Sequence, residues 1–449
     1  MQKEFLRKHA GPAPRYTSYP TAPHFHAGID GDVYARWLRQ LKPGQTLSLY
    51  VHIPWCDRLC WFCGCNTKQT LKYDPLKTYL AALENEMETL AGLIDPGCRV
   101  TALHLGGGSP TMLRPEDMIS LDKALRSRFH FDADAEISVE MDPNDLTDEK
   151  YDALAAIGMT RASIGVQDFD ETVQKAINRL QTFEQTREVV EQVRARGVRS
   201  VNCDVLYGLP HQTRKSVDRT IEQVLTLNPD RIALFGYAHV PWMKTHQKMI
   251  DESALPDVTE RFAQMNRAAS TLTIAGYTAI GIDHFALPAD SLAIAAASGS
   301  MRRNFQGYTS DTADALIGMG ASSIGQLPQG YVQNQPSTGE YQRQVNAGRL
   351  PVVRGFQLST EDRIRARIIE LLMCDFAFSF ANIRHEFGGA AESILDEAEY
   401  LAGCDTEGMI EFSGGLFQIT PKGRPFVRSV ASAFDGYFGT GAARHSLAV

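Results

Sequence analysis

The fold is decided by the stretch TLSLYVHIPWCDRLCWFCGCN at residues 46–66. Residues 46–53 alternate apolar and polar side chains, a pattern that is typical of a β-strand. Three cysteines with the spacing CxxxCxxC follow the strand at once: Cys56, Cys60 and Cys63. The stretch therefore predicts a strand that leads directly into a compact loop carrying three thiols.

Outward from that strand, the chain alternates between helix-like and strand-like patterns. Apolar residues from Leu76 to Ile94 recur at helical spacing and form one stripe of an amphipathic helix. Further strand-like runs lie at residues 100–105, 136–142, 161–167, 200–206 and 231–237. Helix-like runs such as residues 115–126, 148–156 and 183–196 separate them. This alternation predicts six βα units in a parallel sheet, with a seventh strand candidate at residues 278–283.

Polar side chains gather at or just past the carboxyl ends of the predicted strands. They are Glu140, Asp142, Gln167, Asp168, Asp204, Tyr237 and His239. In (β/α) barrels and open α/β sheets, ligands bind at the carboxyl ends of the strands. Each residue alone could be an ordinary structural side chain, but their shared position favours one common site.

The composition fits a globular protein and excludes a disordered, collagen-like or disulfide-scaffold chain. The 449 residues are 43% apolar and 22% charged, and the net charge of −8 argues against nonspecific binding to nucleic acid. No run approaches the roughly 20 apolar residues that cross a bilayer, and the N-terminus lacks the apolar segment of a secretory signal. Half of the eight cysteines cluster at residues 56–65. Such a cluster predicts a metal or redox site in a reducing compartment, here the cytoplasm.

The two ends of the chain differ from the βα region, and we expect an arm at residues 1–44, a barrel region at 45–340 and a C-terminal domain at 341–449. Ser359 can cap a helix, and a Ser-Gly-Gly turn at residues 413–415 predicts a hairpin. Helices followed by a hairpin resemble a winged helix. Residues 361–424, however, hold 6 Lys/Arg and 12 Asp/Glu, a balance of −6 that repels phosphates. We therefore expect a mainly helical lid or packing domain.

The spacing of the cysteine cluster favours iron and sulfur. Three thiolates on one tight loop leave a corner of a [4Fe–4S] cluster open to an outside ligand. The alternative is a structural zinc site in which His52 or Cys65 is the fourth ligand, although zinc sites usually offer paired cysteines or Cys and His on a long arm. A second motif, GGGSP at residues 106–110, follows the second strand. It lacks the GxGxxG spacing and the Walker lysine of phosphate-binding loops.

The two motifs together resemble the radical S-adenosylmethionine (SAM) superfamily and, more closely, its family of oxygen-independent coproporphyrinogen III oxidases, or coproporphyrinogen dehydrogenases. The resemblance continues through RYTSYPTA at 15–22, AEISVEMDP at 135–143, SIGVQDF at 163–169, VNCDVLYGLP at 201–210, NPDRIALFGYAH at 228–239, RNFQGYT at 303–309 and GMGASSIG at 318–325. It implies an α/β fold, a partial (β/α)6 TIM-like barrel with an N-terminal arm and a mainly helical, winged-helix-like C-terminal domain.

The resemblance also implies the site residues. Cys56, Cys60 and Cys63 would bind a [4Fe–4S] cluster, with two molecules of SAM held near it. The residues implied for the first SAM are Tyr50, Gly107, Glu140 and Ile324. Those implied for the second are Phe62, Gly108, Ser109, Gln167, Arg179, Asp204 and Ala238. Tyr50 and Cys65 are expected to be catalytic, Cys65 as a thiol that is not a cluster ligand in the active form.

The activity implied is the anaerobic oxidative decarboxylation of two propionates of coproporphyrinogen III to vinyl groups. It would give protoporphyrinogen IX and consume two SAM in haem biosynthesis. Propionates need cations, and Arg15 and Arg303 are candidates from their motifs alone. We expect a cytoplasmic monomer that receives electrons from a flavodoxin-type donor and has no nucleic-acid partner or membrane span. The alternatives are a haem chaperone on the same scaffold and another tetrapyrrole-active radical SAM enzyme.

Overall fold

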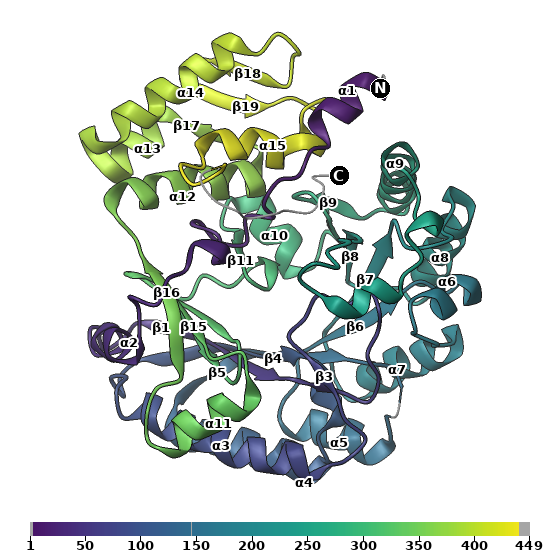
Figure 1. Ribbon diagram of the computed structural model, residues 1–449, viewed down its shortest axis with the longest axis vertical. Coiled ribbons are helices and arrows are strands. Elements are labelled where there is room, and N and C mark those ends of the chain that lie inside the picture. The colour runs from purple at the N-terminus through teal and green to yellow at the C-terminus, as the bar shows by residue number, and fades with distance from the viewer. Residues whose placement is uncertain (1–2, 145, 440–449) are drawn as a thin grey trace.

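The structure, a computed structural model, describes residues 3–144 and 146–439. At its centre is a twelve-stranded sheet in which six parallel strands lie side by side in chain order (Figure 1). They are β1 (Thr46–Ile53), β4 (Arg99–Gly107), β5 (His130–Met141), β6 (Arg161–Gln167), β7 (Ser200–Tyr207) and β8 (Arg231–Gly236). All six predicted strands are confirmed, and β1 and β6 have the predicted bounds. Because the sheet is parallel, their carboxyl ends share one edge.

Helices connect the parallel strands and cover the outer side of the sheet (Figure 1). They are α3 (Asp74–Ala91), α4 (Pro115–Arg128), α5 (Asp148–Ala156), α6 (Glu171–Ala176), α7 (Phe183–Ala195), α8 (Arg214–Thr226) and α9 (Val258–Ile274). Side-chain hydroxyls cap several of them, and Thr182 forms a capping box with Gln185 at the start of α7. This arrangement confirms the predicted partial (β/α)6 barrel.

Strands at both edges extend the sheet beyond the six predicted units. Beside β1 lies a parallel strand, β13 (Ala315–Met319), and three antiparallel strands follow it. These are β14 (Ile324–Leu327), β15 (Gly330–Asn334) and β16 (Val352–Gln357). Beside β8 lie β10 (His284–Ala286) and β9 (Thr278–Ile280), both antiparallel. The expected strand at residues 278–283 is therefore the three-residue edge strand β9. Helix α9 leads from β8 to β9, but the chain then turns at residues 281–283 into β10, which lies between β8 and β9 and is antiparallel to both.

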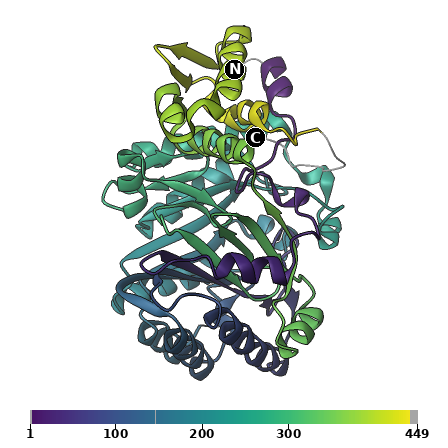
Figure 2. The same ribbon diagram turned by 90° about the vertical axis from the view of Figure 1, so that its left-hand side faces the viewer.

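The C-terminal part forms a layer of its own above the barrel (Figure 2). Its helices are α12 (Thr360–Asp375), α13 (Phe380–Phe387), α14 (Glu392–Cys404) and α15 (Val427–Ala431). The predicted hairpin, β18 (Ile410–Ser413) and β19 (Leu416–Ile419), pairs with an unpredicted strand, β17 (Ala377–Ser379). The mainly helical prediction is confirmed. The division at residue 340 stays a prediction, and the large sheet itself continues through β16 to Gln357.

The N-terminal arm joins this layer to the barrel. Helix α1 (Lys3–His9) packs on the C-terminal layer, where the rings of Phe5 and Phe426 lie 5.4 Å apart. The chain then descends to α2 (Gly31–Leu38) beside the sheet (Figure 1). No helix in the described residues is long and apolar enough to span a membrane. The remaining elements are β2 (Trp55–Cys56), β3 (Lys68–Gln69), α10 (Ser291–Ser298), β11 (Arg302–Asn304), β12 (Gly307–Thr309) and α11 (Thr338–Asn346).

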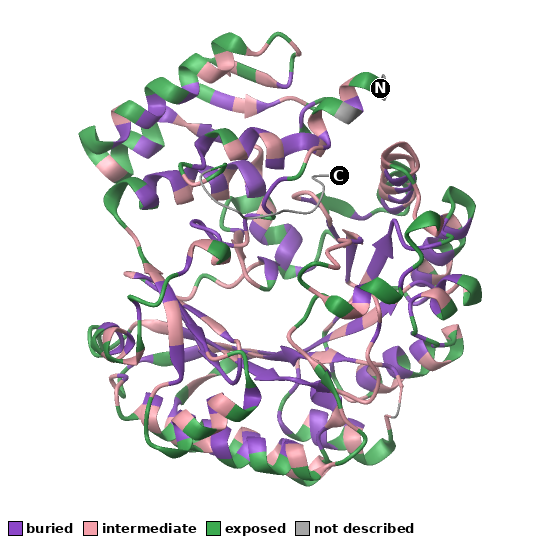
Figure 3. Cartoon of the chain, viewed as in Figure 1, coloured by how far each residue is buried: buried purple, intermediate pink, exposed green. Residues whose placement is uncertain are grey.

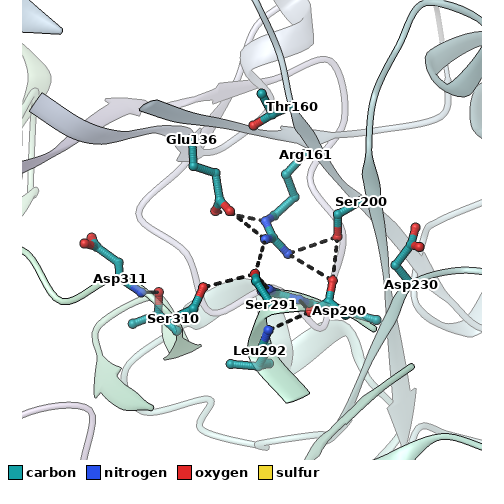
Figure 4. Close-up of polar contacts among 12 residues, drawn as sticks. Glu136, Thr160, Arg161, Ser200, Asp230, Asp290, Ser291, Leu292, Ser310 and Asp311 are labelled. Carbon is teal, nitrogen blue, oxygen red and sulfur yellow. Dashed lines mark hydrogen bonds and ion pairs between the residues drawn. The ribbon is translucent and has the colours of Figure 1, made fainter. Parts of the chain in front are cut away.

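Buried residues concentrate in the sheet and on the inner faces of its helices (Figure 3), and near the amino ends of the strands they include a charged network (Figure 4). Arg161 on β6 binds Glu136 on β5 through two hydrogen bonds of 2.6 and 3.0 Å. Arg231 on β8 donates to Asp290 at 2.5 Å, and Asp290 also accepts from Ser200 at 3.0 Å. Carboxylates thus neutralise both buried guanidinium groups, Arg231 through the buried Asp290 and Arg161 through the partly exposed Glu136.

Replacing Asp290 by alanine should destabilise the fold strongly. The change leaves the Arg231 guanidinium without its carboxylate and removes the cap that the Leu292 amide donates to at the start of α10. Breaking a buried pair from one side costs about 3–5 kcal/mol. Urea denaturation followed by circular dichroism would measure the loss. As a control, Glu171→Ala breaks an exposed pair with Lys175 and should cost under about 0.5 kcal/mol. Equal losses of stability in the two variants would contradict the role of Asp290 as the buried counter-charge of Arg231.

Candidate functional site

The cysteine loop leaves the carboxyl end of β1 and is fixed by backbone contacts with two other segments. The amide of Trp61 donates to the carbonyl of Ile177, just after α6, at 2.9 Å. The side chain of Gln247, in the short helix Thr245–Met249, donates to the carbonyl of Phe62 at 3.0 Å. These contacts set the position of the thiols without using the thiols themselves.

Two of the three thiols have distinct polar neighbours. Cys56 Sγ lies 3.2 Å from the hydroxyl of Thr67, and burial raises the pKa of the Cys56 thiol to about 12. Cys60 Sγ lies 3.6 Å from Nη1 of Arg179. Burial raises the pKa of the Cys60 thiol, and the Arg179 charge opposes that rise. A guanidinium beside Cys60 favours the thiolate, which is the form that binds metal.

The third thiol, Cys63, pairs with Cys65 instead. The amide of Cys65 donates to Cys63 Sγ at 3.3 Å. Hydrogen bonds from the thiol and amide of Cys65 lower the pKa of the Cys63 thiol, which burial opposes. Cys65 itself is exposed, and its carbonyl accepts from Nζ of Lys244 at 2.9 Å. Cys65 therefore supports Cys63 and still faces open space.

A mononuclear zinc site does not fit this arrangement. Within residues 3–144 and 146–439, no three His, Cys, Asp or Glu side chains lie close enough together to hold one metal ion. Both ring nitrogens of His52 are engaged, one with the hydroxyl of Tyr50 and the other with the carbonyl of Asn66, each at 2.9 Å. A cluster with several irons spreads its thiolates over separate corners, so the three cysteines fit such a cluster better.

The glycine run after β4 is pressed against the cysteine loop. A Cβ at Gly108 would lie 2.5 Å from the carbonyl oxygen of Trp55, and one at Gly107 would lie 2.5 Å from the ring of His52. Gly107 also has a φ of +109°, in the region that side chains rarely adopt. Only bare backbone fits here, and it brings unblocked peptide groups to the edge of the site.

Glu140, near the carboxyl end of β5, is held by the same glycine run. Its carboxylate accepts from the Gly107 amide at 2.9 Å and pairs with Nε2 of His104 at 3.0 Å. Burial opposes its charge, but the His104 contact and the Gly107 amide hold the pKa of the Glu140 carboxyl below its usual value. The ring of Tyr50 stacks on His104 at 5.7 Å. Two acceptor positions of the carboxylate are used, and the others are open to a ligand.

Arg179 lies in the loop after α6, and Asp204 lies on β7. Arg179 donates to Asp142 at 3.1 Å and to the Gly165 carbonyl at 2.7 Å, while its Nε is buried and has no partner. Asp204 accepts from Asn202 at 2.8 Å. Burial, which the Glu140 charge reinforces, raises the pKa of Asp204 to about 6. The Nε of Arg179 and the carboxylate of Asp204 can therefore still form hydrogen bonds with a ligand.

The other predicted residues occupy the same edge of the sheet. Gln167 ends β6 in a left-handed conformation, with φ of +64°. Gln247 donates to the carbonyls of both Phe62 and Ala238 and so joins these two residues. Ile324 begins β14, whose backbone lies against Gly318, the partner of Tyr50 in the sheet. Ser109 differs from the other residues. Its side chain is buried, and its hydroxyl forms a hydrogen bond of 2.9 Å with the hydroxyl of Thr111.

Sequence reasoning missed two contributors to the site, His104 and Thr67. His104 lies in the LHLGGG run at an inward-facing position, so the alternation of β4 could have identified it as a partner for a carboxylate on the next strand. Thr67 gives no such signal, since only the folded loop brings its hydroxyl to Cys56.

The chain is also similar to known proteins over most of its length. A profile described as "Radical SAM superfamily" matches residues 50–224, and one described as "HemN C-terminal domain" matches residues 358–426. The chain is 46% identical to the oxygen-independent coproporphyrinogen III oxidase of Bradyrhizobium diazoefficiens over 97% of both chains. It is also 46% identical to that of Paracoccus denitrificans, over 97% of this chain and 96% of the relative.

Among solved structures, coproporphyrinogen III oxidase (HemN) from Escherichia coli, described as a radical SAM enzyme, matches with a TM-score of 0.91 and 38% identity. The match covers 98% of this chain and 99% of that one. High identity and a shared fold both extend from the arm into the C-terminal layer. The chain therefore belongs to the family of oxygen-independent coproporphyrinogen III oxidases within the radical SAM superfamily.

Proposed function

We propose that this protein carries out the anaerobic oxidative decarboxylation of two propionates of coproporphyrinogen III to vinyl groups. The product is protoporphyrinogen IX, an intermediate of haem biosynthesis, and two SAM are consumed. The observation that carries the proposal is the packing of the CxxxCxxC loop against the glycine run and Glu140, in a chain similar to these oxidases over 97% of its length.

The residues present fit an iron–sulfur cluster and SAM. Cys56, Cys60 and Cys63 would hold a [4Fe–4S] cluster on their single turn. Together, the bound cluster and SAM supply one-electron chemistry that takes a hydrogen atom from a propionate β-carbon. Glu140 would bind ribose hydroxyls with its open acceptor positions, and Gly107 would admit the amino-acid part of SAM close to the backbone. Tyr50 and Ile324 would line the same pocket.

The second SAM would bind on the other side of the loop. Arg179 suits its carboxylate, because Nε is buried without a partner and the guanidinium lies on the strand ends. Gln167 and Asp204 offer polar groups to an adenosine or ribose. The remaining contacts proposed are Phe62, Gly108, Ser109 and Ala238.

Cys65 would act in turnover and not as a cluster ligand. Its thiol is exposed beside Cys63, where it can exchange a hydrogen with, or pack against, the substrate. We further propose that the arm at residues 1–44 and the domain at 341–449 close over the barrel at 45–340. The protein would work as a cytoplasmic monomer reduced by a flavodoxin-type donor.

Anaerobic incubation with coproporphyrinogen III, a reductant and SAM tests the function. We expect carbon dioxide, divinyl product and about two SAM cleaved per protoporphyrinogen, because each hydrogen abstraction uses one radical initiator. Chromatography of the porphyrins and of 5′-deoxyadenosine would measure this ratio. Tight haem binding without turnover would indicate a chaperone, and a linear tetrapyrrole would indicate another enzyme of the superfamily; either result would contradict the proposal.

The cysteines can be tested by iron content. Alanine at Cys56, Cys60 or Cys63 should abolish the visible absorbance of the cluster, because each thiolate binds a separate iron. A full four-iron complement in any of these variants would rule out that cysteine as a ligand.

Cys65→Ser is the matched control for those variants. It should keep iron content and the reduced-cluster EPR signal near the wild-type values but lose most of the conversion of coproporphyrinogen III. Loss of iron would make Cys65 a ligand, and full activity would make its thiol incidental.

Glu140→Ala should weaken SAM binding while the cluster stays intact. Hydrogen bonds to a charged group contribute about 1.5–3 kcal/mol, which corresponds to roughly ten- to a hundredfold in affinity. Equilibrium dialysis under nitrogen would measure it. Asp134→Asn, an exposed change on the same strand, is the control and should leave affinity unchanged. Unchanged affinity in the Glu140 variant would place this carboxylate outside the site.

A further inference from the structure

Four arginines from separate parts of the chain converge at the carboxyl end of β8. Arg428, on α15, donates to the carbonyls of residues 13 and 14 in the arm, the latter at 2.9 Å. Arg303, on β11, donates to the carbonyl of Arg15 at 3.2 Å. Arg15 in turn donates to the carbonyl of residue 236, and Arg261, on α9, to that of residue 237, at 3.0 and 2.9 Å. We call these four residues the arginine cluster.

The arginine cluster has few negative charges to balance it. Within the described residues, Arg15, Arg261 and Arg303 form no ion pair, and they donate hydrogen bonds to backbone carbonyls. The Arg303 guanidinium also lies 4.3 Å from the ring of Tyr308. Asp283 supplies one negative charge, which acts on both Arg15 and Arg303; this carboxylate is also hydrogen-bonded to His284 at 2.6 Å. Burial and the other guanidinium charges lower the pKa of Arg428 to about 9, and burial lowers that of Arg261. The cluster carries excess positive charge.

Other buried arginines in this fold do have carboxylate partners. Arg161 pairs with Glu136 and Arg231 with Asp290 in the network of Figure 4. Arg179 pairs with Asp142 at 3.1 Å. A desolvated charge without a counter-charge costs several kcal/mol, so the fold normally supplies one. The guanidinium groups of Arg15, Arg261 and Arg303, which form no ion pair within the described residues, therefore point to a carboxylate or similar anion that comes from a ligand.

Two donors in the arginine cluster are left without a hydrogen-bond acceptor by the protein itself. Nε of Arg261 and Nη1 of Arg303 are buried and have no hydrogen-bond partner, and Arg15 is exposed. The cluster also lies beside a proposed SAM contact and beside a cavity. Residue 237 precedes Ala238, a residue proposed to contact SAM, and Arg303 lines a cavity of about 790 Å³ together with Tyr16 and Tyr19 of the arm.

Building on the proposed function, we propose that the arginine cluster binds propionate carboxylates of coproporphyrinogen III. A guanidinium presents paired N–H groups that match a carboxylate, and the substrate carries a carboxylate on each of its propionates. The assignment extends the two candidates from sequence motifs, Arg15 and Arg303, to Arg261 and Arg428. It assigns substrate recognition jointly to the arm, the barrel and the C-terminal layer.

Binding of coproporphyrin III, the oxidised and non-reacting form of the substrate, tests this assignment directly. Fluorescence titration should show roughly ten- to a hundredfold weaker binding to Arg303→Gln and to Arg15→Gln than to the wild type. The tetramethyl ester of coproporphyrin III, presented in the same detergent, lacks carboxylates and should bind all variants equally. Arg267→Gln is the matched control and should bind coproporphyrin III like the wild type, because Arg267 is an exposed arginine on α9 that pairs with Asp218.

The outcomes separate this assignment from the proposed function. Equal affinity of the wild type and both variants for coproporphyrin III would overturn the assignment, even if the wild type makes protoporphyrinogen. Failure of the wild type to make it would overturn the proposed function, whatever the porphyrin titration gives. If inorganic phosphate displaces coproporphyrin as well as a dicarboxylate does, the cluster is a general anion site and the assignment fails. Should Arg303→Gln not fold, the exposed Arg15→Gln variant decides.

Discussion

The close approach of two backbones, the cysteine loop after β1 and the glycine run after β4, is the constraint on which the site depends. The Gly108 amide donates to the carbonyl of Ile53 at 2.8 Å, and the Ser109 amide donates to that of Trp55 at the same distance. A side chain at residue 108 would collide with the Trp55 carbonyl. Because these bonds are backbone to backbone, the direction of the cysteine loop does not depend on any thiol. The Gly107 amide then holds Glu140, so one contact positions both halves of the pocket.

Strand β5 shows how the two ends of the barrel are used differently. Glu136 and Glu140 lie on the same strand at different depths of the barrel. Glu136 is tied to Arg161 by two hydrogen bonds and contributes to stability. Glu140 is held by one amide and one imidazole, which leave acceptor positions free. In such barrels, residues that take part in catalysis commonly lie at the carboxyl ends of the strands, and residues that stabilise the fold lie at the amino ends. Glu140 and Glu136 follow this division.

The sequence predicted the parallel strands and the cysteine loop because both depend on local patterns. Alternation over residues 46–53 and 161–167 suffices to delimit β1 and β6, since each is buried and short. Strand β13 and the three strands beyond it were missed, because each has only four to six residues. β13 in addition pairs with β1, far back in the chain, whereas β14, β15 and β16 pair with strands close to them in sequence. Cysteine spacing indicated metal chemistry, but no spacing links Thr67 to Cys56 or His104 to Glu140. These contacts exist only once neighbouring elements have packed.

The residues of the arginine cluster are also far apart in the sequence and meet only in the folded chain. Its members span the chain from residue 15 to residue 428, so no local pattern contains them. Carbonyls of the arm accept hydrogen bonds from Arg428 and Arg303, and a carbonyl of β8 accepts one from Arg15. Carbonyl oxygens fix the guanidinium groups in place but do not cancel their charge. The contacts that fasten the arm and the C-terminal layer to the barrel therefore also keep positive charge available at the strand ends. A ligand with carboxylates supplies negative charge at the carboxyl ends of the strands. At the amino ends, the protein's own Glu136 and Asp290 supply it.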